Sequence, residues 1–308
     1  MSGAPDAPRV PQVTAPLVAH DREGAYHRLV FAAPEVAEQA RPGQFVALAV
    51  GGAASATLLR RCFSIHRVDT RDGTVSLVVA SNGPGTQWLT ALAPSGAAVE
   101  TAAVDTAAVD MVGPLGRPFP LPQSPTGCVL VGGGYGSAPL FWLGERLQGA
   151  GCSVDLVLGA ASADRLYGVD QAEALGGGVS LTTDDGSVGA RGWVSDVLPG
   201  VIRRGGATVV YGCGPMAMLA SVSGIAGAHG AVAHVAVEES MACGVGVCMT
   251  CVLAVVGEDG RTRMVRSCVE GPVFRGDRVR WDALGQGWGA VPDDAVGAPA
   301  PARGRVDR

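Results

Sequence analysis

Hydrophobic and polar residues follow two different rhythms along the chain, and the change between them separates two kinds of domain. From residue 13 to 113, short apolar runs are separated by Gly, Pro and Asp turns, as around segments 44–50 and 74–80. This pattern predicts antiparallel strands in a small β-barrel. From residue 126 to 237 the order becomes strand, glycine loop, helix and strand, which predicts a parallel sheet covered by helices. We therefore expect a multidomain β plus α/β protein.

The segments outside these two domains have different compositions. Residues 114–125 carry closely spaced prolines and are expected to form a stiff linker between barrel and sheet. Residues 238–284 contain a group of cysteines and are expected to form a small third module. Residues 1–12 and 285–308 are rich in Pro and Ala and have few large apolar side chains to bury, so both ends are expected to be disordered.

Composition narrows the class of partner. The chain has 308 residues, a formal net charge of -5 and an isoelectric point near 5.5, which argue against nucleic acid or an anionic membrane as partners. The N-terminal residues have no basic and apolar pattern of a signal peptide, and no run of about 20 apolar residues occurs. A cytoplasmic location is therefore expected.

Four cysteines near the C-terminal end carry the strongest chemical signal. They are Cys243, Cys248, Cys251 and Cys268. Gaps of four and two residues followed by a distant fourth thiolate match the plant-ferredoxin spacing for a 2Fe-2S cluster. Gly244 and Gly246 let the backbone wrap closely around a cluster whose sulfurs accept N–H bonds. A structural zinc site and a pair of disulfides are the alternatives for this spacing.

Two segments of the predicted barrel suggest a flavin site. The run Arg-Cys-Phe-Ser at residues 61–64 resembles the Arg-x-Tyr-Ser signature of the ferredoxin-reductase superfamily, with Phe63 in place of Tyr. A guanidinium suits a diphosphate because its planar fork makes two parallel bonds. An edge strand with a solvated arginine is the alternative for this run. The second segment ends in Gly85 and Thr86, where Thr86 is expected to cap a helix whose N-terminus faces the flavin diphosphate.

The α/β domain carries two glycine motifs of nicotinamide-binding domains. The first is Gly-Gly-Gly-Tyr-Gly-Ser-Ala-Pro at residues 132–139, placed between a strand and a helix, where only glycine lets the backbone approach a pyrophosphate. The second is Cys-Gly-Pro at residues 213–215, after a late strand. Both match the nicotinamide domain of ferredoxin reductases, in which the cysteine lies near the nicotinamide.

Three further runs make the resemblance more specific. They are Thr-Asp-Asp-Gly-Ser at residues 183–187, Glu-Glu-Ser-Met-Ala-Cys-Gly at 238–244 and Cys-Val-Glu-Gly-Pro-Val-Phe at 268–274. Together they resemble the electron-transfer subunits of B-type dihydroorotate dehydrogenases. This resemblance implies a catalytic partner with FMN, in a heterotetramer of two of each chain. The partner would oxidise dihydroorotate in pyrimidine biosynthesis, and this chain would pass the electrons through a 2Fe-2S cluster and FAD to NAD.

The resemblance assigns the expected cofactor contacts residue by residue. For FAD they are Arg61, Cys62, Phe63, Ser64, Val78, Val79, Ala80, Gly85 and Thr86. For NAD they are Gly132, Gly133, Gly134, Gly136, Thr183, Asp184, Cys213, Gly214 and Pro215. The four cysteines 243, 248, 251 and 268 would bind the cluster.

Several alternatives remain open on the sequence. The same build serves reductase components of oxygenases and subunits of sulfide dehydrogenase or transhydrogenase-like complexes, and a scaffold protein that has lost its cofactors is a third possibility. The histidines sit in no triad or ligand spacing, so no catalytic residue is assigned and substrate chemistry would belong to the partner. Arg165 is expected to be a solvated surface residue, and without an arginine pair for a 2′-phosphate the sequence favours NAD over NADP.

Overall fold

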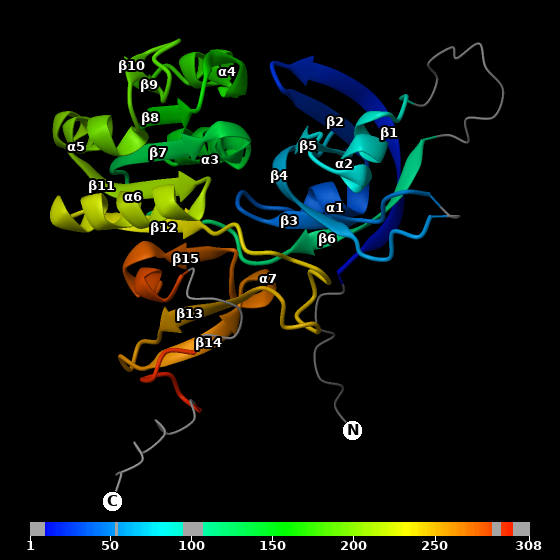
Figure 1. Ribbon diagram of the computed structural model, residues 1–308. Helices are drawn as coiled ribbons and strands as arrows, with labels where there is room; N and C mark the ends of the chain where they lie inside the picture. The colour runs from blue at the N-terminus through cyan, green and yellow to red at the C-terminus, as the bar shows by residue number, and fades with distance from the viewer. Residues whose placement is uncertain (1–9, 53–54, 95–106, 285–290, 298–308) are drawn as a thin grey trace, which may run out of the picture.

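The computed structural model describes residues 10–52, 55–94, 107–284 and 291–297 (Figure 1). Most of the two ends expected to be disordered, at residues 1–9, 285–290 and 298–308, lies outside the described residues. Within the described ranges, no helix is both long and apolar enough to cross a membrane.

The N-terminal part of the chain forms a closed six-stranded barrel, as predicted. In spatial order its strands are β1 (Gln12–Glu23), β2 (Tyr26–Ala32), β5 (Thr74–Ala80), β4 (Arg61–Asp69), β3 (Phe45–Leu48) and β6 (Ala108–Leu115). All neighbours pair antiparallel. The short helices α1 (Pro34–Gln39) and α2 (Pro84–Thr90) complete the domain. Burial alternates residue by residue along β6, which is the pattern of a strand with one face on the core.

The second domain is a seven-stranded sheet between two helical layers. Its strands, in spatial order, are β10 (Ala190–Arg191), β9 (Val179–Thr183), β8 (Ser153–Ala160), β7 (Gly127–Gly133), β11 (Ala207–Cys213), β12 (Val232–Ala236) and β15 (Val273–Arg275). The helices are α3 (Ala138–Gly149), α4 (Val169–Ala174), α5 (Val194–Gly205) and α6 (Met216–Ala228). Six strands pair in parallel, as predicted, while β15 pairs antiparallel to β12 at the edge.

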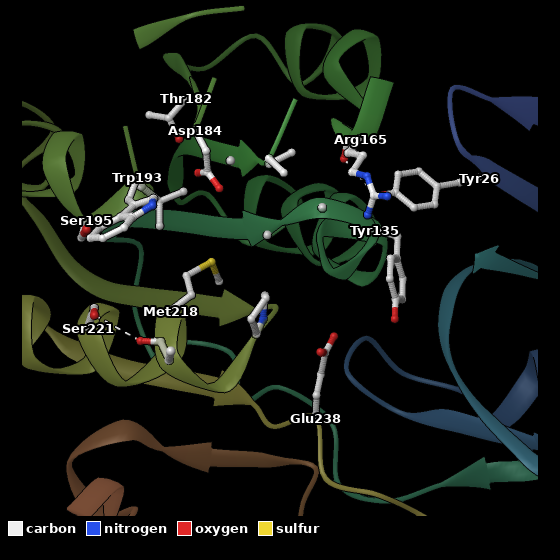
Figure 2. Close-up of a pocket in the computed structure, with 18 residues that line it drawn as sticks. Tyr26, Tyr135, Arg165, Thr182, Asp184, Trp193, Ser195, Met218, Ser221 and Glu238 are labelled. Carbon is white, nitrogen blue, oxygen red and sulfur yellow. Dashed lines mark hydrogen bonds between the residues drawn. The ribbon is translucent and has the colours of Figure 1, made fainter. Parts of the chain in front are cut away.

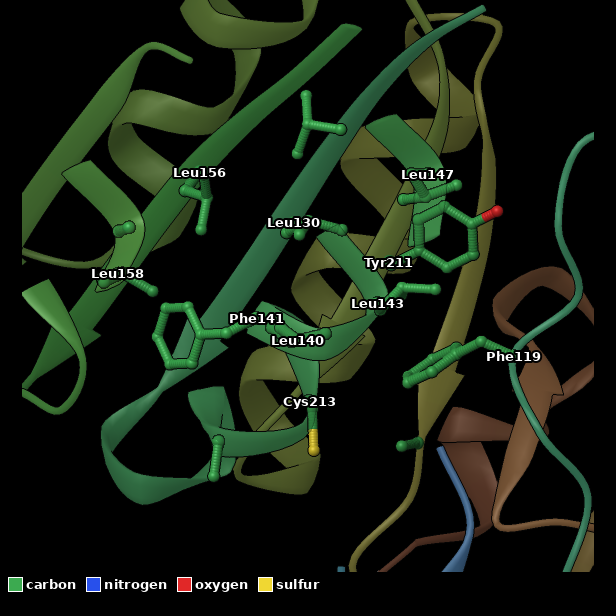
Figure 3. Packing of buried hydrophobic residues seen from close by; sticks show 14 of the residues in the cluster. Phe119, Leu130, Leu140, Phe141, Leu143, Leu147, Leu156, Leu158, Tyr211 and Cys213 are labelled. Atoms are coloured by element: carbon green, nitrogen blue, oxygen red, sulfur yellow. The ribbon is translucent and has the colours of Figure 1, made fainter. Parts of the chain in front are cut away.

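Strand β7 shows why the sheet needs helices on both faces. Cys128 and Leu130 lie in the core beneath α3, whereas Val129 and Val131 lie in the core beneath α5 and α6. Figure 3 shows Leu130 packed with Leu140 and Leu143 of α3. Both faces of the strand are therefore apolar, which is typical of a parallel sheet.

The C-terminal segment is tied to the α/β domain more closely than a separate module would be. It contains the hairpin β13 (Val252–Val256) and β14 (Thr262–Arg266), the short helix α7 (Ser267–Glu270) and strand β15. Because β15 joins the large sheet, this segment and the α/β domain share a hydrogen-bonded edge.

Both ends include residues that are more ordered than the composition predicted. Gln12 begins β1 and pairs with Val112. In the tail, Arg280 binds Asp294 at 2.7 Å, and Val296 donates to the carbonyl oxygen of Thr262 at 2.8 Å. The expectation of disorder was therefore wrong for these residues, because strand pairing and polar contacts hold segments that have few large apolar side chains.

Candidate functional site

A cavity of about 500 Å³ opens above the carboxyl ends of the parallel strands (Figure 2). Its walls come from the ends of β7, β8 and β9, the first turns of α5 and α6, and Tyr26 of the barrel. A crevice at the carboxyl ends of parallel strands is the usual ligand site of an open α/β sheet. The cavity therefore lies where the sequence predicted a nucleotide site.

The first glycine motif forms the central wall of this cavity and has two structural roles. Gly133 and Gly134 line the cavity. Gly132 and Gly136 instead make room for the chain: a Cβ on Gly136 would lie 2.8 Å from Cα of Gly214, and a Cβ on Gly132 would lie 2.5 Å from Cβ of Ser137. The two predicted glycine motifs are thus in direct backbone contact.

The residues of the Cys-Gly-Pro motif differ in whether they reach the cavity surface. Pro215 lines the cavity, and the side chain of Cys213 is 4 % exposed beneath it. Burial raises the pKa of the Cys213 thiol, so this thiol stays protonated. A neutral, apolar sulfur at this position suits packing against a ring and not nucleophilic attack.

In the run at residues 183–187, one side chain lines the cavity and its neighbour holds the loop together. Asp184 lines the cavity. Thr183 is fully buried, and its hydroxyl donates to Val188 O at 2.8 Å and accepts from Val188 N at 3.1 Å, so this side chain holds the loop together. Thr182, which sequence reasoning passed over, lines the cavity in its place.

Several cavity residues were missed by the sequence. Arg165 is exposed, as expected, and also lines the cavity, as do Trp193 and Glu238. Tyr26 packs its ring against Tyr135 with centroids 5.5 Å apart. Tyr135 and Glu238 do lie inside runs that the sequence analysis quotes, although it assigned them no contact. Tyr26, Arg165 and Trp193 come from separate elements that only the fold brings together.

The barrel and the α/β domain are joined around the cavity. Tyr26 donates its hydroxyl to Arg165 O at 3.1 Å, and Gly168 N donates to a carboxylate oxygen of Glu23 at 2.7 Å. At the start of α3, His66 of β4 donates from Nδ1 to the Ala138 carbonyl oxygen at 2.7 Å. These bonds fix the position of a predicted flavin domain relative to a predicted nicotinamide domain.

The Arg61 guanidinium forms no ion pair with any of the described residues. Its Nη1 donates to the carbonyl oxygen of Leu59 at 2.9 Å, and none of the described residues pairs a carboxylate with it. Its neighbour Arg60, by contrast, pairs with Asp110 at 2.7 Å. A Cβ on Gly85 would lie 3.3 Å from Nε of Arg61, so the two predicted flavin segments meet. Free positive charge beside a glycine turn fits a diphosphate.

The N-terminus of α2 differs from the expectation in one detail. Gly83 is the N-cap, and Thr86 sits at the third helical position. The Thr86 hydroxyl accepts from the backbone N–H groups of Asn82 and Gly83, each at 3.0 Å. Thr86 therefore closes the turn from inside the helix, since glycine has no side chain with which to cap.

Strand β4 presents different side chains to different neighbours. Phe63 packs against the barrel core, whereas Cys62 packs beneath the cysteine loop. A Cβ on Gly244 would lie 3.2 Å from Sγ of Cys62. Ser64 is exposed. On β5, Val78 and Val79 are buried and Ala80 pairs with Tyr26. The strand expected to bind flavin therefore also contacts the cysteine loop.

The four cysteines of the C-terminal segment occur as two pairs. Cys251 and Cys268 are each 2 % exposed and lie in one apolar cluster, whereas Cys248 is exposed. Sγ of Cys243 accepts the N–H of Val247 at 3.3 Å, and Sγ of Cys248 accepts the hydroxyl of Thr250 at 3.1 Å. The hydrogen bonds from Thr250, and to a smaller extent those with Cys243, lower the pKa of the Cys248 thiol to about 6.

The donor set fits an iron–sulfur cluster. Thiolates that already accept N–H and O–H bonds are what such a cluster requires. Gly244 at φ +72° and Gly246 at φ +80° make the turns between them. Among the described residues, no three His, Cys, Asp or Glu side chains form a group that could hold a metal ion, so the prediction of a cluster rests on the spacing of the four cysteines and on the bonds that Cys243 and Cys248 accept.

Comparison with known proteins identifies relatives over most of the chain. Residues 238–280 match the iron-sulfur cluster binding domain of dihydroorotate dehydrogenase B. A protein of Desulforamulus reducens, described as dihydroorotate dehydrogenase B (NAD(+)), electron transfer subunit, is 34 % identical over 252 residues, which cover 82 % of this chain and 91 % of that protein. The protein of the same description from Shouchella clausii is 38 % identical over 252 residues, covering 80 % and 90 %.

Solved structures give a consistent result. The structure of an NADH-dependent reduced ferredoxin-NADP oxidoreductase aligns with a TM-score of 0.74 at 28 % identity and covers 92 % of this chain and 93 % of its own. The ferredoxin reductase of carbazole 1,9a-dioxygenase aligns with a TM-score of 0.55 at 20 % identity, covering 72 % and 67 %, and shows the shared fold alone.

Proposed function

Because the chain belongs to the family of electron-transfer subunits of dihydroorotate dehydrogenase B, we propose that it carries electrons from an FMN-containing catalytic subunit to NAD⁺ in pyrimidine biosynthesis. In this proposal the 2Fe-2S cluster and then FAD connect the two. When bound, FAD exchanges both hydride and single electrons, whereas NAD accepts only hydride and the cluster accepts only one electron. FAD is therefore proposed to lie between the cluster and NAD in the electron path.

The observation that carries the proposal is the contact between the two halves of the site. Strand β4 brings Arg61 to one side and Cys62 to the other, and Cys62 packs against the loop of Gly244. The predicted flavin strand therefore touches the predicted cluster loop. Tyr26, on the neighbouring strand β2, borders the nucleotide cavity. One compact barrel thus contacts both the place where single electrons would enter and the place where hydride would leave.

The cysteine loop has the surface expected for a partner. Val247 is 78 % exposed and Met249 is 54 % exposed, on either side of the exposed Cys248. An apolar rim around a redox group excludes water from a contact with another protein. We propose that the catalytic subunit binds over this loop, in a heterotetramer of two of each chain.

A second function keeps the same relay but changes the partner. The structural likeness to a ferredoxin-NADP oxidoreductase supports a reductase component of another NAD(P)H-linked system. The sequence identity of that protein, 28 %, is lower than the 34 % and 38 % of the dihydroorotate dehydrogenase subunits. The dihydroorotate function is therefore the one we favour.

The experiment divides the reaction between the two subunits. The purified full chain, loaded with FAD and cluster, is assayed alone and after assembly with an FMN-containing dihydroorotate dehydrogenase subunit. We expect the chain alone to oxidise NADH with ferricyanide but to form no orotate, and the complex to reduce NAD⁺ with dihydroorotate. Orotate formation by the chain alone, or a stable complex that cannot reduce NAD⁺, would overturn the proposal.

A further inference from the structure

One arginine bonds to the middle of the cysteine loop. Nη1 of Arg266 donates to the carbonyl oxygen of Gly246 at 2.9 Å. The other half of that peptide group is the N–H of Val247, which donates to Sγ of Cys243 at 3.3 Å. A guanidinium, a peptide group and a sulfur therefore form one continuous chain of hydrogen bonds. The sulfur at its end belongs to the proposed ligand set of the cluster.

Arg266 also lies beside the segment that carries the two buried cysteines. It is the last residue of β14, where it pairs with Val252, the residue that follows Cys251. Cys268 comes two residues later, in α7. The N–H of Ser267 donates to the carbonyl oxygen of Cys251 at 2.9 Å, which ties the start of α7 to that cysteine. Arg266 therefore connects the loop to both members of the buried pair.

The contact between this arginine and the loop is close. A Cβ on Gly246 would lie 3.5 Å from Nη1 of Arg266 and 2.5 Å from Cγ2 of Val269. The Arg266 side chain is 37 % exposed, and water screens a partly buried charge less than an exposed one. Residues 238–250 contain no lysine or arginine, so the loop itself carries no other positive side chain of this kind.

Glu270 supplies the counter-charge of Arg266. Nη2 of Arg266 pairs with one carboxylate oxygen of Glu270 at 3.3 Å. The second oxygen, Oε2, is buried and has no hydrogen-bond partner among the described residues. The pair is therefore a single long bond and not the two-bond fork that an arginine and a carboxylate can form. The shorter of these two bonds of Arg266 is the one to the loop.

We propose that Arg266, with Glu270 as its counter-charge, positions the cysteine loop and raises the reduction potential of the cluster. The inference rests on the proposed function, because it concerns the cluster that this function requires. A group that gains one electron becomes more negative by one charge, and a nearby cation stabilises that form. The hydrogen bonds add to this effect, because bonds in series polarise one another and bonds to the sulfurs help to set the potential.

The test is an anaerobic redox titration of the full chain, loaded with FAD and cluster. Dithionite is the reductant, and electron paramagnetic resonance measures the reduced cluster. We expect Arg266→Gln to lower the ratio of reduced to oxidised cluster about tenfold at a fixed ambient potential, which equals about 59 mV for one electron. Glu270→Gln removes the opposing charge and is expected to raise the same ratio about threefold.

Arg263→Gln is the matched control. Arg263 lies on the same strand, but its side chain pairs with Asp259 at 2.6 Å and bonds to the carbonyl oxygen of Arg261, outside the loop. Its replacement removes the same charge and should leave the cluster potential unchanged. Arg266→Lys keeps the charge without the planar fork, so its potential should lie closer to that of the wild type than the potential of Arg266→Gln does.

The two charge variants have opposite expected signs, which a merely structural role would not produce. A wild-type potential in Arg266→Gln, an equal shift in Arg263→Gln, or a fall in Glu270→Gln would overturn the proposal. If Arg266→Gln cannot hold the cluster, Glu270→Gln still tests the sign, since it keeps Arg266 and its bond to Gly246. A wild-type chain that binds no 2Fe-2S cluster would overturn the proposed function; a bound cluster whose potential ignores both residues would overturn only this inference.

Discussion

The nucleotide cavity and the cysteine loop are both expected to hold a cofactor, but they are organised in opposite ways. The cavity wall is made of strand ends, and behind it Gly136 packs directly on the backbone of Gly214. The loop from residue 238 to 250 has no helix or strand and exposes Val247, Cys248 and Met249. The first site is set by the fold. The second is a loop that turns at Gly244 and Gly246, where a bound metal group would add its binding energy to the stability of the folded chain.

The largest expected effect comes from replacing a cysteine of the loop. Cys248→Ser removes the exposed member of the proposed ligand set, so we expect the iron–sulfur absorbance to be lost and NAD⁺ reduction by dihydroorotate in the assembled complex to fall by several orders of magnitude. NADH should still reduce bound FAD in the same variant, since Cys248 is not a cavity residue. Stopped-flow absorbance of the two half-reactions separates these outcomes.

Cys62→Ser is the matched control for this variant. Cys62 also contacts the loop, but from the barrel, and the assignment of Cys243, Cys248, Cys251 and Cys268 leaves it outside the ligand set. We expect it to keep the cluster. A cluster that survives in Cys248→Ser, or one that is lost in Cys62→Ser, would show that the four-cysteine assignment is wrong.

The next effect tests how firmly the fold sets the cavity. Burial lowers the pKa of His66 to about 4, although its bond to Ala138 O acts in the opposite direction. The folded chain therefore binds a proton less readily than the unfolded chain, whose histidine titrates near 6.5. Stability from this group is complete above pH 6.5 and is lost as the pH falls toward 4.

We expect this loss to reach about 3 kcal/mol. Urea unfolding of the full chain at several values between pH 7.5 and 4 measures it, with His66→Gln as the variant that cannot titrate. The variant should show a flatter pH profile over this window. Profiles of equal slope would mean that the contact between β4 and α3 does not depend on a neutral imidazole.

The difference between local patterns and contacts made by the fold explains what could be predicted from the sequence and what could not. The barrel, the parallel sheet and the cysteine group follow from periodicity and spacing, which are local properties of the chain. Trp193, Arg165 and Tyr26 come from three separate elements, so their meeting in one cavity depends on packing that no local pattern records. The edge strand β15 was missed for a related reason, because three residues are too few to establish a period.

A smaller effect is expected where the glycine motifs touch. Gly136→Ala would bring a methyl group to 2.8 Å from the Gly214 backbone, which has no flexible side chain to move aside. We expect NAD⁺ affinity to fall about thirtyfold, equivalent to about 2 kcal/mol, while FAD and cluster are retained. Gly149→Ala meets nothing within 4 Å and should bind NAD⁺ normally. If both variants bind equally well, the contact between the motifs is not what shapes the cavity.

The smallest expected effect concerns Arg61, on the strand that lies between the predicted flavin site and the cysteine loop. Arg61 lies on β4 beside Cys62, donates only to backbone carbonyls among the described residues, and is the cation that we expect to pair with the FAD diphosphate. Arg61→Ala removes at least one charge-assisted bond, worth about 1.5 kcal/mol, so FAD should dissociate about tenfold more readily. Flavin retention during dialysis measures this, and the iron–sulfur absorbance should be unchanged because Cys62 and the loop remain. Arg71→Ala, in the turn after β4, changes the same charge on the same barrel and should retain FAD as the wild type does. Equal retention in all three proteins would make Arg61 an ordinary surface arginine and would leave the flavin site without its proposed cation.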